Sequence, residues 1–330
     1  MARPLRVQFE DAIYHLCARG NARERIFRGE KDQARFVEFL EESARRFDVS
    51  PFCFVLMGNH FHLLAQTRRP NLTRWMHWLS VAYTVYFNRQ HRRSGHLFQG
   101  RFKSFLVQSG SGYLLTLSRY LHLNPVRGVV LGRGTPSERR ERLRAFKWST
   151  YRGYAGLGRQ FPFVEETAVL NILGARAVAQ RLDYRRFVEE GLVREIENPF
   201  EAVRWQAVLG DESFGQTIRD RVQAMGRPSR EIPPLREMRQ TVSPERILER
   251  AAKRYKVKVK RLMEGEYGLE ARNVAMWMLW EGGNQTLREI GELFGGMDYA
   301  AVAQRIRRAR LAYTEKSAAK LRKQILNIEI

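Results

Sequence analysis

Two kinds of hydrophobic pattern alternate along the N-terminal part of the chain. Four short segments with apolar runs predict strands: 8–18, 52–57, 60–66 and 102–109. Three longer segments carry apolar residues at helical spacing and predict helices: 31–49, 71–91 and 111–124. Gly58 and Asn59 are suited to a tight hairpin turn between two of the strands. The resulting order predicts an α+β fold, in which helices pack on a ferredoxin-like antiparallel sheet.

The rest of the chain predicts an all-α region that ends in a separate helical unit. Residues 226–238 contain three prolines and indicate a linker. After them, Ser243 is suited to cap a helix whose first position is Pro244. We therefore expect a catalytic-type α+β domain, a mostly helical basic adaptor with linker, and a C-terminal helical domain, over residues 1–135, 136–238 and 239–330.

Composition and charge point to a nucleic-acid partner. The 330 residues are 44% hydrophobic, which is typical of globular proteins, and carry a net charge of +23, which attracts polyanions. No segment approaches the about 18 consecutive apolar residues of a membrane helix, so no membrane partner is expected. The first residues lack the apolar stretch of a secretory signal. With Cys17 and Cys53 as the only cysteines, the sequence favours a cytoplasmic nucleic-acid-binding protein.

Candidate chemistry lies in two places. His60 and His62 are two apart on a predicted strand and share one face, where two imidazoles can bind one divalent metal. Tyr120 and Asn124 are four apart on a predicted helix and also share a face. A tyrosine oxygen can act as a nucleophile, and an amide oxygen can complete a metal site. Simpler interpretations stay open for each. Of His60 and His62, one can be a core residue and the other exposed; Tyr120 can be a core aromatic; and Asn124 can end the helix before Pro125.

The ordered motifs "YHLCARGNARERIF", "MGNHFHLL", "GHLFQGRFKS", "YLHLNPVRG" and "WSTY" resemble the REP-associated tyrosine transposases. These are single-tyrosine, IS200-like members of the HUH nuclease superfamily, and the resemblance covers roughly residues 8–225. It implies that His60 and His62 bind the metal, that Tyr120 is the nucleophile and that Asn124 is the third ligand. The family usually has proline in place of Gly58. Tyr113, on the same predicted helix, is the rival nucleophile.

The resemblance also implies a function. It predicts a metal-dependent single-strand DNA endonuclease and strand transferase acting on repeat hairpins, with a 5′-phosphotyrosine intermediate and a free 3′-hydroxyl. Mg²⁺ or Mn²⁺ is the expected cofactor, although two histidines also tolerate zinc. Two alternatives remain: a non-catalytic regulator that binds hairpin or duplex DNA, and an RNA-binding protein. The oligomeric state, monomer or homodimer, is left open.

Basic residues around the predicted site are candidates for DNA contact. The strongest lie in one segment between the two halves of the site: Arg92, Arg93, Arg101 and Lys103. Arg19 and Asn21 are weaker candidates. Phe98 and Phe102 can stack on bases, but core packing is the favoured interpretation for both.

The C-terminal unit resembles the helix-turn-helix domain of the bacterial replication initiator DnaA, through "ARNVAMWML" and "TLREIGELFGGMDYAAVAQRI". The resemblance implies a duplex-DNA partner, with Arg272 reaching toward the minor groove. Of the initiator's base-contacting pattern only Asp298 remains, so its binding sequence is not expected here. Arg305 and three further arginines of the last predicted helix can hold phosphates without reading bases: Arg307, Arg308 and Arg310.

Overall fold

The computed structural model describes residues 7–110, 112–158, 160–174, 177–194, 196, 198–204, 207–224, 242–264, 269–283 and 285–326. They form two compact units: Gln8–Pro199, and a second unit of Val7 with the described residues from Phe200 onward. The expected linker, residues 226–238, lies outside the described residues, so the structure does not test that prediction.

The first unit begins with the predicted succession of elements. These are β1 (Ala12–Arg19), η1 (Asn21–Arg23), α1 (Glu30–Phe47), β2 (Val49–Met57), β3 (His60–Thr67), α2 (Leu72–Gln90), β4 (Lys103–Val107) and α3 (Gly112–Leu123). Short helical pieces follow: η2 (Asn124–Val126), α4 (Gly128–Leu131), α5 (Pro136–Ala145), α6 (Tyr151–Tyr154), α7 (Thr167–Leu170), η3 (Asn171–Leu173) and α8 (Ala177–Glu190).

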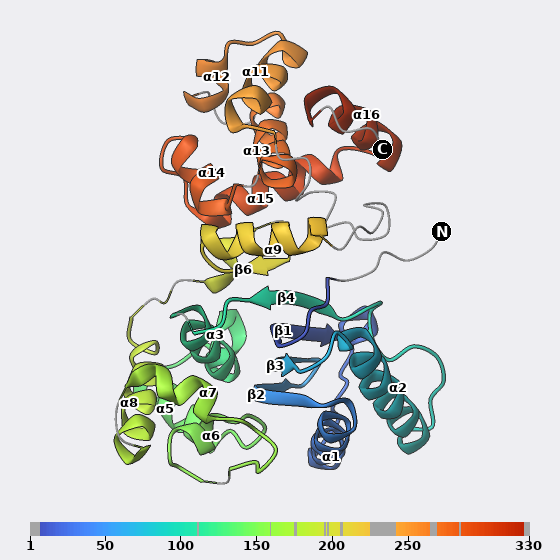
Figure 1. Cartoon of the computed structure of the whole chain (residues 1–330), viewed down its shortest axis with the longest axis vertical. Coiled ribbons are helices and arrows are strands. Elements are labelled where there is room, and N and C mark those ends of the chain that lie inside the picture. The colour runs from blue at the N-terminus through green and yellow to red at the C-terminus, as the bar shows by residue number, and fades with distance from the viewer. Residues whose placement is uncertain are drawn as a thin grey trace. The chain divides into compact units, whose positions relative to one another are not determined.

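The strands of this unit lie in the order β2-β3-β1-β4, and neighbouring strands run antiparallel. This order confirms the predicted α+β class with its ferredoxin-like sheet. Helices α1 and α2 lie on one side of the sheet and α3 on the other (Figure 1). Phe61 of β3 packs on Phe36 of α1, with 4.8 Å between ring centroids, so the odd-numbered face of β3 is the α1 side. Residues 60 and 62 therefore face the side of α3.

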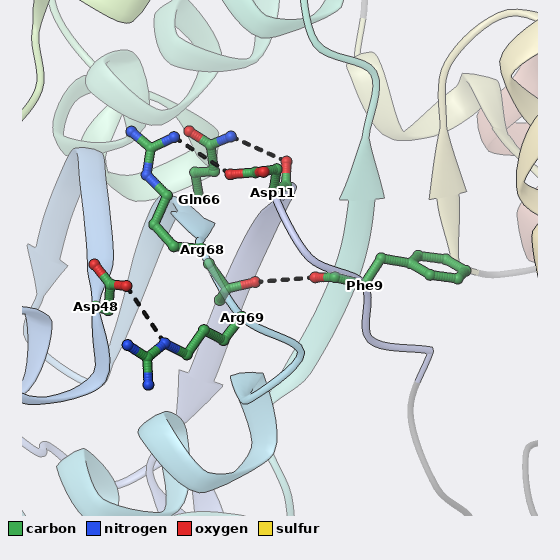
Figure 2. A network of polar contacts seen from close by, with 7 residues as sticks. Phe9, Asp11, Asp48, Gln66, Arg68 and Arg69 are labelled. Atoms are coloured by element: carbon green, nitrogen blue, oxygen red, sulfur yellow. Dashed lines mark hydrogen bonds and ion pairs between the residues drawn. The ribbon is translucent and has the colours of Figure 1, made fainter.

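Polar contacts at the far end of β3 help to set its register against β1 (Figure 2). The Gln66 amide donates to the Asp11 carbonyl at 3.0 Å, and Arg68 lies 3.3 Å from the Asp11 carboxylate. The Thr67 hydroxyl donates to the Phe9 carbonyl at 3.5 Å. A one-residue slip would carry every side chain of β3 to the opposite face, so these contacts help to keep the even-numbered positions on the α3 side.

The outer edge of β2 is covered by the segment that contains the WSTY motif. The Leu56 amide donates to the Trp148 carbonyl at 2.8 Å, and the Thr150 amide donates to the Phe54 carbonyl at 3.1 Å. This pairing protects an otherwise open sheet edge. It also joins the residues after 135 to the sheet in one compact unit that extends to Pro199. The three-part division expected from the sequence stays a prediction.

His122 of α3 forms the centre of a buried hydrogen-bond network. The Tyr184 hydroxyl donates to Ser118 at 2.8 Å, so it accepts from Nδ1 of His122 at 2.7 Å. The Thr150 hydroxyl then donates to Nε2 of His122 at 2.8 Å while accepting from the Phe54 amide. The network connects α3 and α8 to β2, and its members are satisfied only when the imidazole is neutral.

Burial lowers the pKa of His122 from 6.5 to about 3, which predicts an acid-sensitive fold. In the unfolded chain the His122 imidazole binds a proton below about pH 6.5, whereas in the folded chain it does so only below about pH 3. The free energy of unfolding therefore falls as the pH falls through this window. We expect His122 to account for about 2 kcal/mol of the unfolding free energy lost between pH 7 and pH 5. Urea unfolding at both pH values should show a correspondingly smaller loss in His122→Gln. An equal loss in both proteins would contradict this assignment.

The second unit consists of a short hairpin and a set of helices. It contains β5 (Val203–Arg204), β6 (Val208–Leu209), α9 (Glu212–Ala224), α11 (Pro244–Tyr255), α12 (Val259–Glu264), α13 (Glu270–Gly282), α14 (Leu287–Leu293), α15 (Tyr299–Leu311) and α16 (Glu315–Leu326). Ser243 caps α11 as predicted, accepting from the Arg246 amide. The central core is formed by α13 with side chains of α11, α14, α15 and α16.

Helices α14 and α15 form a closely packed pair joined by a glycine-containing turn. A Cβ on Gly291 would lie 2.0 Å from the Met297 carbonyl oxygen, so only glycine allows the turn to approach α14 this closely. The apolar residues Ile290, Val302 and Ile306 are buried in the core. Within the described residues, no helix combines the length and apolar character needed to span a membrane.

Candidate active site

Strand β3 presents His60 and His62 on one face, opposite two residues of β1. Arg19 pairs with His60 and Cys17 pairs with His62 across the antiparallel ladder. The two imidazole rings have centroids 5.1 Å apart and lie nearly perpendicular, at 86°. Both side chains are partly buried, at the edge between the sheet and solvent. The shared face expected from their spacing is therefore present.

The His60 ring is held by the hairpin turn that precedes it. Its Nδ1 lies 2.7 Å from Oδ1 of Asn59, while Nδ2 of Asn59 donates to the Arg23 carbonyl at 3.1 Å. Because the amide oxygen can only accept, Nδ1 of His60 carries the proton. The lone pair of Nε2 is then available to bind a cation, which is the usual arrangement of a metal-binding histidine.

The His62 ring is held by a third histidine. Nδ1 of His62 lies 2.9 Å from Nε2 of His15 on β1. The two rings stack with centroids 5.1 Å apart and an interplanar angle of 20°. His62 therefore also engages its Nδ1 with a protein group, and Nε2 is the nitrogen that remains for a ligand.

Burial keeps both candidate ligands uncharged. Desolvation, with a smaller contribution from Arg19, lowers the pKa of His60 from 6.5 to about 4. Desolvation and the neighbouring His15, His60 and Arg19 hold the pKa of His62 well below its usual value. Neutral imidazoles are the form that binds metals, so no proton has to be displaced at neutral pH.

Tyr120 and Asn124 lie at the end of α3 and the start of η2. Burial raises the pKa of Tyr120, whereas the charge of Arg127 lowers it and a thiolate at Cys17 would raise it. The Arg127 guanidinium lies over the Tyr120 ring, 4.9 Å from its centroid. Tyr120 lies on α3, the helix on the side of the sheet that His60 and His62 face (Figure 1). Asn124 donates through Nδ2 to the Tyr120 and Leu121 carbonyls, each at 3.3 Å, and its amide oxygen is the atom left to bind a cation.

The basic candidates separate into two groups. Arg19 and Lys103 flank the site, because Arg19 pairs with His60 and Lys103 pairs with Cys17. Arg92 and Arg93 follow α2 instead, with Arg93 3.9 Å from Glu24.

The remaining predicted contacts near the sheet are partly explained by packing. Arg101 is exposed and precedes β4. Asn21 lies in η1, where its backbone N–H donates to the Leu97 carbonyl. Phe98 packs on Phe61 with 6.0 Å between ring centroids, which supports the core interpretation. Their assignment to DNA contact stays a prediction.

In the second unit, two of the predicted DNA contacts, Arg272 and Asp298, have structural roles. Arg272 is only 8% exposed and donates to the Phe294 carbonyl at 2.8 Å. The Asp298 carboxylate caps α15, accepting from the Ala300 and Ala301 amides. Arg305 lies on α15 and is partly exposed. Burial, and to a smaller extent the charge of Arg305, lowers the pKa of Arg272.

Four residues of the site had no role assigned from the sequence: His15, Cys17, Asn59 and Arg127. His15 and Cys17 are two residues apart on β1 and therefore share a face, and Cys17 pairs with His62. Two such residues at a spacing of two in an otherwise apolar strand are a pattern that the sequence shows. Asn59 follows the turn glycine directly and was attributed to turn geometry. No sequence pattern would have placed Arg127 over the Tyr120 ring.

The residue types present fit a divalent cation. Among the described residues, no group of three or more His, Cys, Asp and Glu side chains is arranged to hold a metal. Two neutral histidines with Nδ1 engaged therefore need a ligand of another type, and the Asn124 amide oxygen stays the predicted one. Imidazole nitrogens with open positions for a phosphate fit a divalent cation, and the choice of Mg²⁺ or Mn²⁺ stays the prediction from the resemblance.

Comparisons with known proteins agree with this part of the molecule. Residues 8–124 match a family model described as "Transposase IS200 like". No curated protein matches the chain. Among solved structures, one similar chain is described as "Structure of the REP associates tyrosine transposase bound to a REP hairpin", with 12% identity, a TM-score of 0.38, and coverage of 50% of this chain and 98% of that one. The similarity to the IS200-like transposase family thus extends over residues 8–124.

Proposed function

We propose that the chain is a metal-dependent, tyrosine-nucleophile endonuclease and strand transferase of single-stranded DNA hairpins. The observation that carries the proposal is the pair His60 and His62 on one face of β3, each with Nδ1 engaged by a protein group, on the side of the sheet that carries α3 and Tyr120 (Figure 1). The match of residues 8–124 to the IS200-like transposase family supports the same reaction class. A protein that only binds hairpins needs neither paired, Nδ1-anchored histidines nor a tyrosine beside them.

In the proposed reaction, the Tyr120 oxygen attacks the scissile phosphorus while the bond to the 3′ oxygen breaks. The phenol loses its proton to solvent and the departing 3′ oxygen takes one up, so no nucleotide cofactor is consumed. The new phosphotyrosine ester retains the bond energy for rejoining. Arg127 favours the phenolate by its charge, which partly offsets the effect of burial.

His60, His62 and Asn124 would hold the cation, Mg²⁺ or Mn²⁺. When bound, it supplies a Lewis acid that polarises the scissile phosphate. Arg19 and Lys103, beside the histidines, would hold the flanking backbone phosphates of the single strand. Arg92, Arg93, Arg101 and Asn21 are proposed as outer contacts to the hairpin.

A covalent-adduct assay tests this proposal. Purified protein is mixed with single-stranded hairpin DNA labelled downstream of the cut, with Mn²⁺ or with EDTA. We expect labelled DNA at protein mass that survives denaturation and requires the metal. Tight hairpin binding without any adduct, across several hairpins, would instead favour the regulator that binds DNA without cleaving it. Binding and cutting of an all-RNA hairpin would favour the RNA alternative.

We also infer that the C-terminal unit docks on duplex DNA through α15. Supporting features are the α14–α15 pair and the exposed arginines Arg307 and Arg308. Arg272 and Asp298 are tied to the fold, so we propose phosphate contact through Arg305 and its neighbours without base reading. A cytoplasmic, nucleoid-associated location and a monomeric or homodimeric state belong to the same proposal.

Replacing Arg307 and Arg308 by alanine should weaken duplex binding about tenfold at moderate salt. The dependence of log affinity on log salt should become shallower by about 2, since two phosphate contacts are lost. The matched control is Lys320→Ala with Lys323→Ala, which removes the same charge from α16. Fluorescence anisotropy with labelled duplex DNA compares the two double variants. If both weakened binding equally, the effect of Arg307 and Arg308 would come from net charge alone, and the proposed contact through α15 would be contradicted.

A further inference from the structure

A third histidine lies behind the metal-binding candidates. His15 occupies the middle of β1 and is 1% exposed. Its ring lies between two others, with centroids 5.1 Å from His62 and 5.9 Å from Phe105, both nearly parallel to it. Its Nε2 meets Nδ1 of His62 at 2.9 Å. An apolar aromatic would stack equally well here, so packing alone does not account for an imidazole.

Only one proton arrangement of this pair leaves His62 able to bind a metal. Two neutral imidazoles share one proton across the contact between them. If His15 donated from Nε2, Nδ1 of His62 would accept, its proton would lie on Nε2, and no lone pair would remain for a cation. If Nδ1 of His62 donates, Nε2 of His62 carries the lone pair and His15 keeps its own proton on Nδ1.

We propose that His15 is a positioning residue that accepts the Nδ1 proton of His62 and thereby fixes the metal-binding tautomer. The inference deepens the proposed function and rests on it. His15 does not itself reach the cation, because its Nε2 is directed at Nδ1 of His62, on the side of that ring remote from Nε2. Buried acceptors of this kind are known to set both the tautomer and the orientation of a ligating histidine.

The neighbouring ligand is held in the same way. Asn59 Oδ1 accepts from Nδ1 of His60 at 2.7 Å and is oriented by the Arg23 carbonyl. Each proposed ligand thus donates its Nδ1 proton to an acceptor from a different element, the hairpin turn for His60 and β1 for His62. The two rings are held independently, so removing one acceptor should weaken the site without dismantling it.

Two substitutions separate the hydrogen bond from packing. His15→Phe keeps a flat ring between His62 and Phe105 but removes the acceptor. His15→Gln restores an acceptor oxygen at about the reach of Nε2. Mn²⁺ affinity, measured by titration calorimetry without DNA, should fall about 10- to 100-fold in His15→Phe and stay within about threefold of the original protein in His15→Gln. Hairpin binding in EDTA should be unchanged in both.

A second measurement does not depend on metal binding. Long-range ¹H–¹⁵N spectra of the metal-free, histidine-labelled protein report which nitrogen of each ring is protonated. We expect His62, assigned by its loss in His62→Ala, to carry its proton on Nδ1, and to become a mixture of tautomers in His15→Phe. Finding the proton on Nε2 in the original protein, or unchanged Mn²⁺ affinity in His15→Phe, would overturn the inference. Absence of Mn²⁺ binding by the original protein would count against the proposed function, while the tautomer result would still decide the role of His15.

Discussion

Replacing Tyr120 with phenylalanine is expected to abolish the covalent protein–DNA adduct and to lower strand cleavage at least about 1,000-fold. The substitution removes only the attacking oxygen of the proposed nucleophile. The phenyl ring still packs beneath the Arg127 guanidinium, so folding and hairpin affinity should be retained. Gel analysis of the denatured, labelled adduct measures the effect.

Tyr113→Phe is the matched control. Tyr113 is the second residue of the same helix and is likewise partly buried. It should form the adduct at the original rate. If Tyr113→Phe lost the adduct and Tyr120→Phe kept it, the assignment of the nucleophile would be reversed.

Removing either histidine of β3 should have the second largest effect. His60→Ala or His62→Ala takes away one of two nitrogen ligands, and we expect Mn²⁺-dependent cleavage to fall at least about 100-fold. Hairpin binding in EDTA should stay within about threefold, because Arg19 and Lys103 still flank the site. Single-turnover cleavage over a range of Mn²⁺ concentrations, together with binding in EDTA, separates the two effects.

The control for these substitutions is His96→Ala. His96 is exposed in the loop before β4 and lies outside the proposed ligand set. Cleavage by this variant should match the original protein. Full metal-dependent cleavage by His60→Ala would show that the cation is held elsewhere.

Much of the α+β unit could be predicted because its local signals agree with its tertiary structure. The strand and helix patterns gave the element order, and that order matches the sheet that forms. The period of two on β3 correctly placed His60 and His62 on one face, since the pleat obeys the same period whatever the partner strands.

Pairings between distant residues could not be predicted in this way. The register that sets Cys17 opposite His62 depends on contacts such as those of Asp11 with Gln66 and Arg68. For the same reason His15 received no role, because its significance appears only when β1 lies beside β3. The burial of Arg272 could not be predicted either, because its hydrogen-bond partner, the Phe294 carbonyl, lies 22 residues further along the chain.

The segment after α3 shows a further limit of sequence patterns. Its basic, loop-like composition predicted an adaptor, yet Trp148 and Thr150 pair with β2, and Thr150 joins the His122 network. Edge pairing uses backbone groups, which composition does not reveal.

The central claim is that Tyr120 becomes joined to DNA, and peptide mass spectrometry of the adduct tests it most directly. Trypsin cuts after Arg119 and Arg127, so Tyr120 lies in the peptide 120–127 and Tyr113 in the peptide 104–119. After nuclease trimming, the account predicts a nucleotide phosphate on 120–127, with fragment ions that assign it to Tyr120. The same mass on 104–119, or on any other residue, would contradict it.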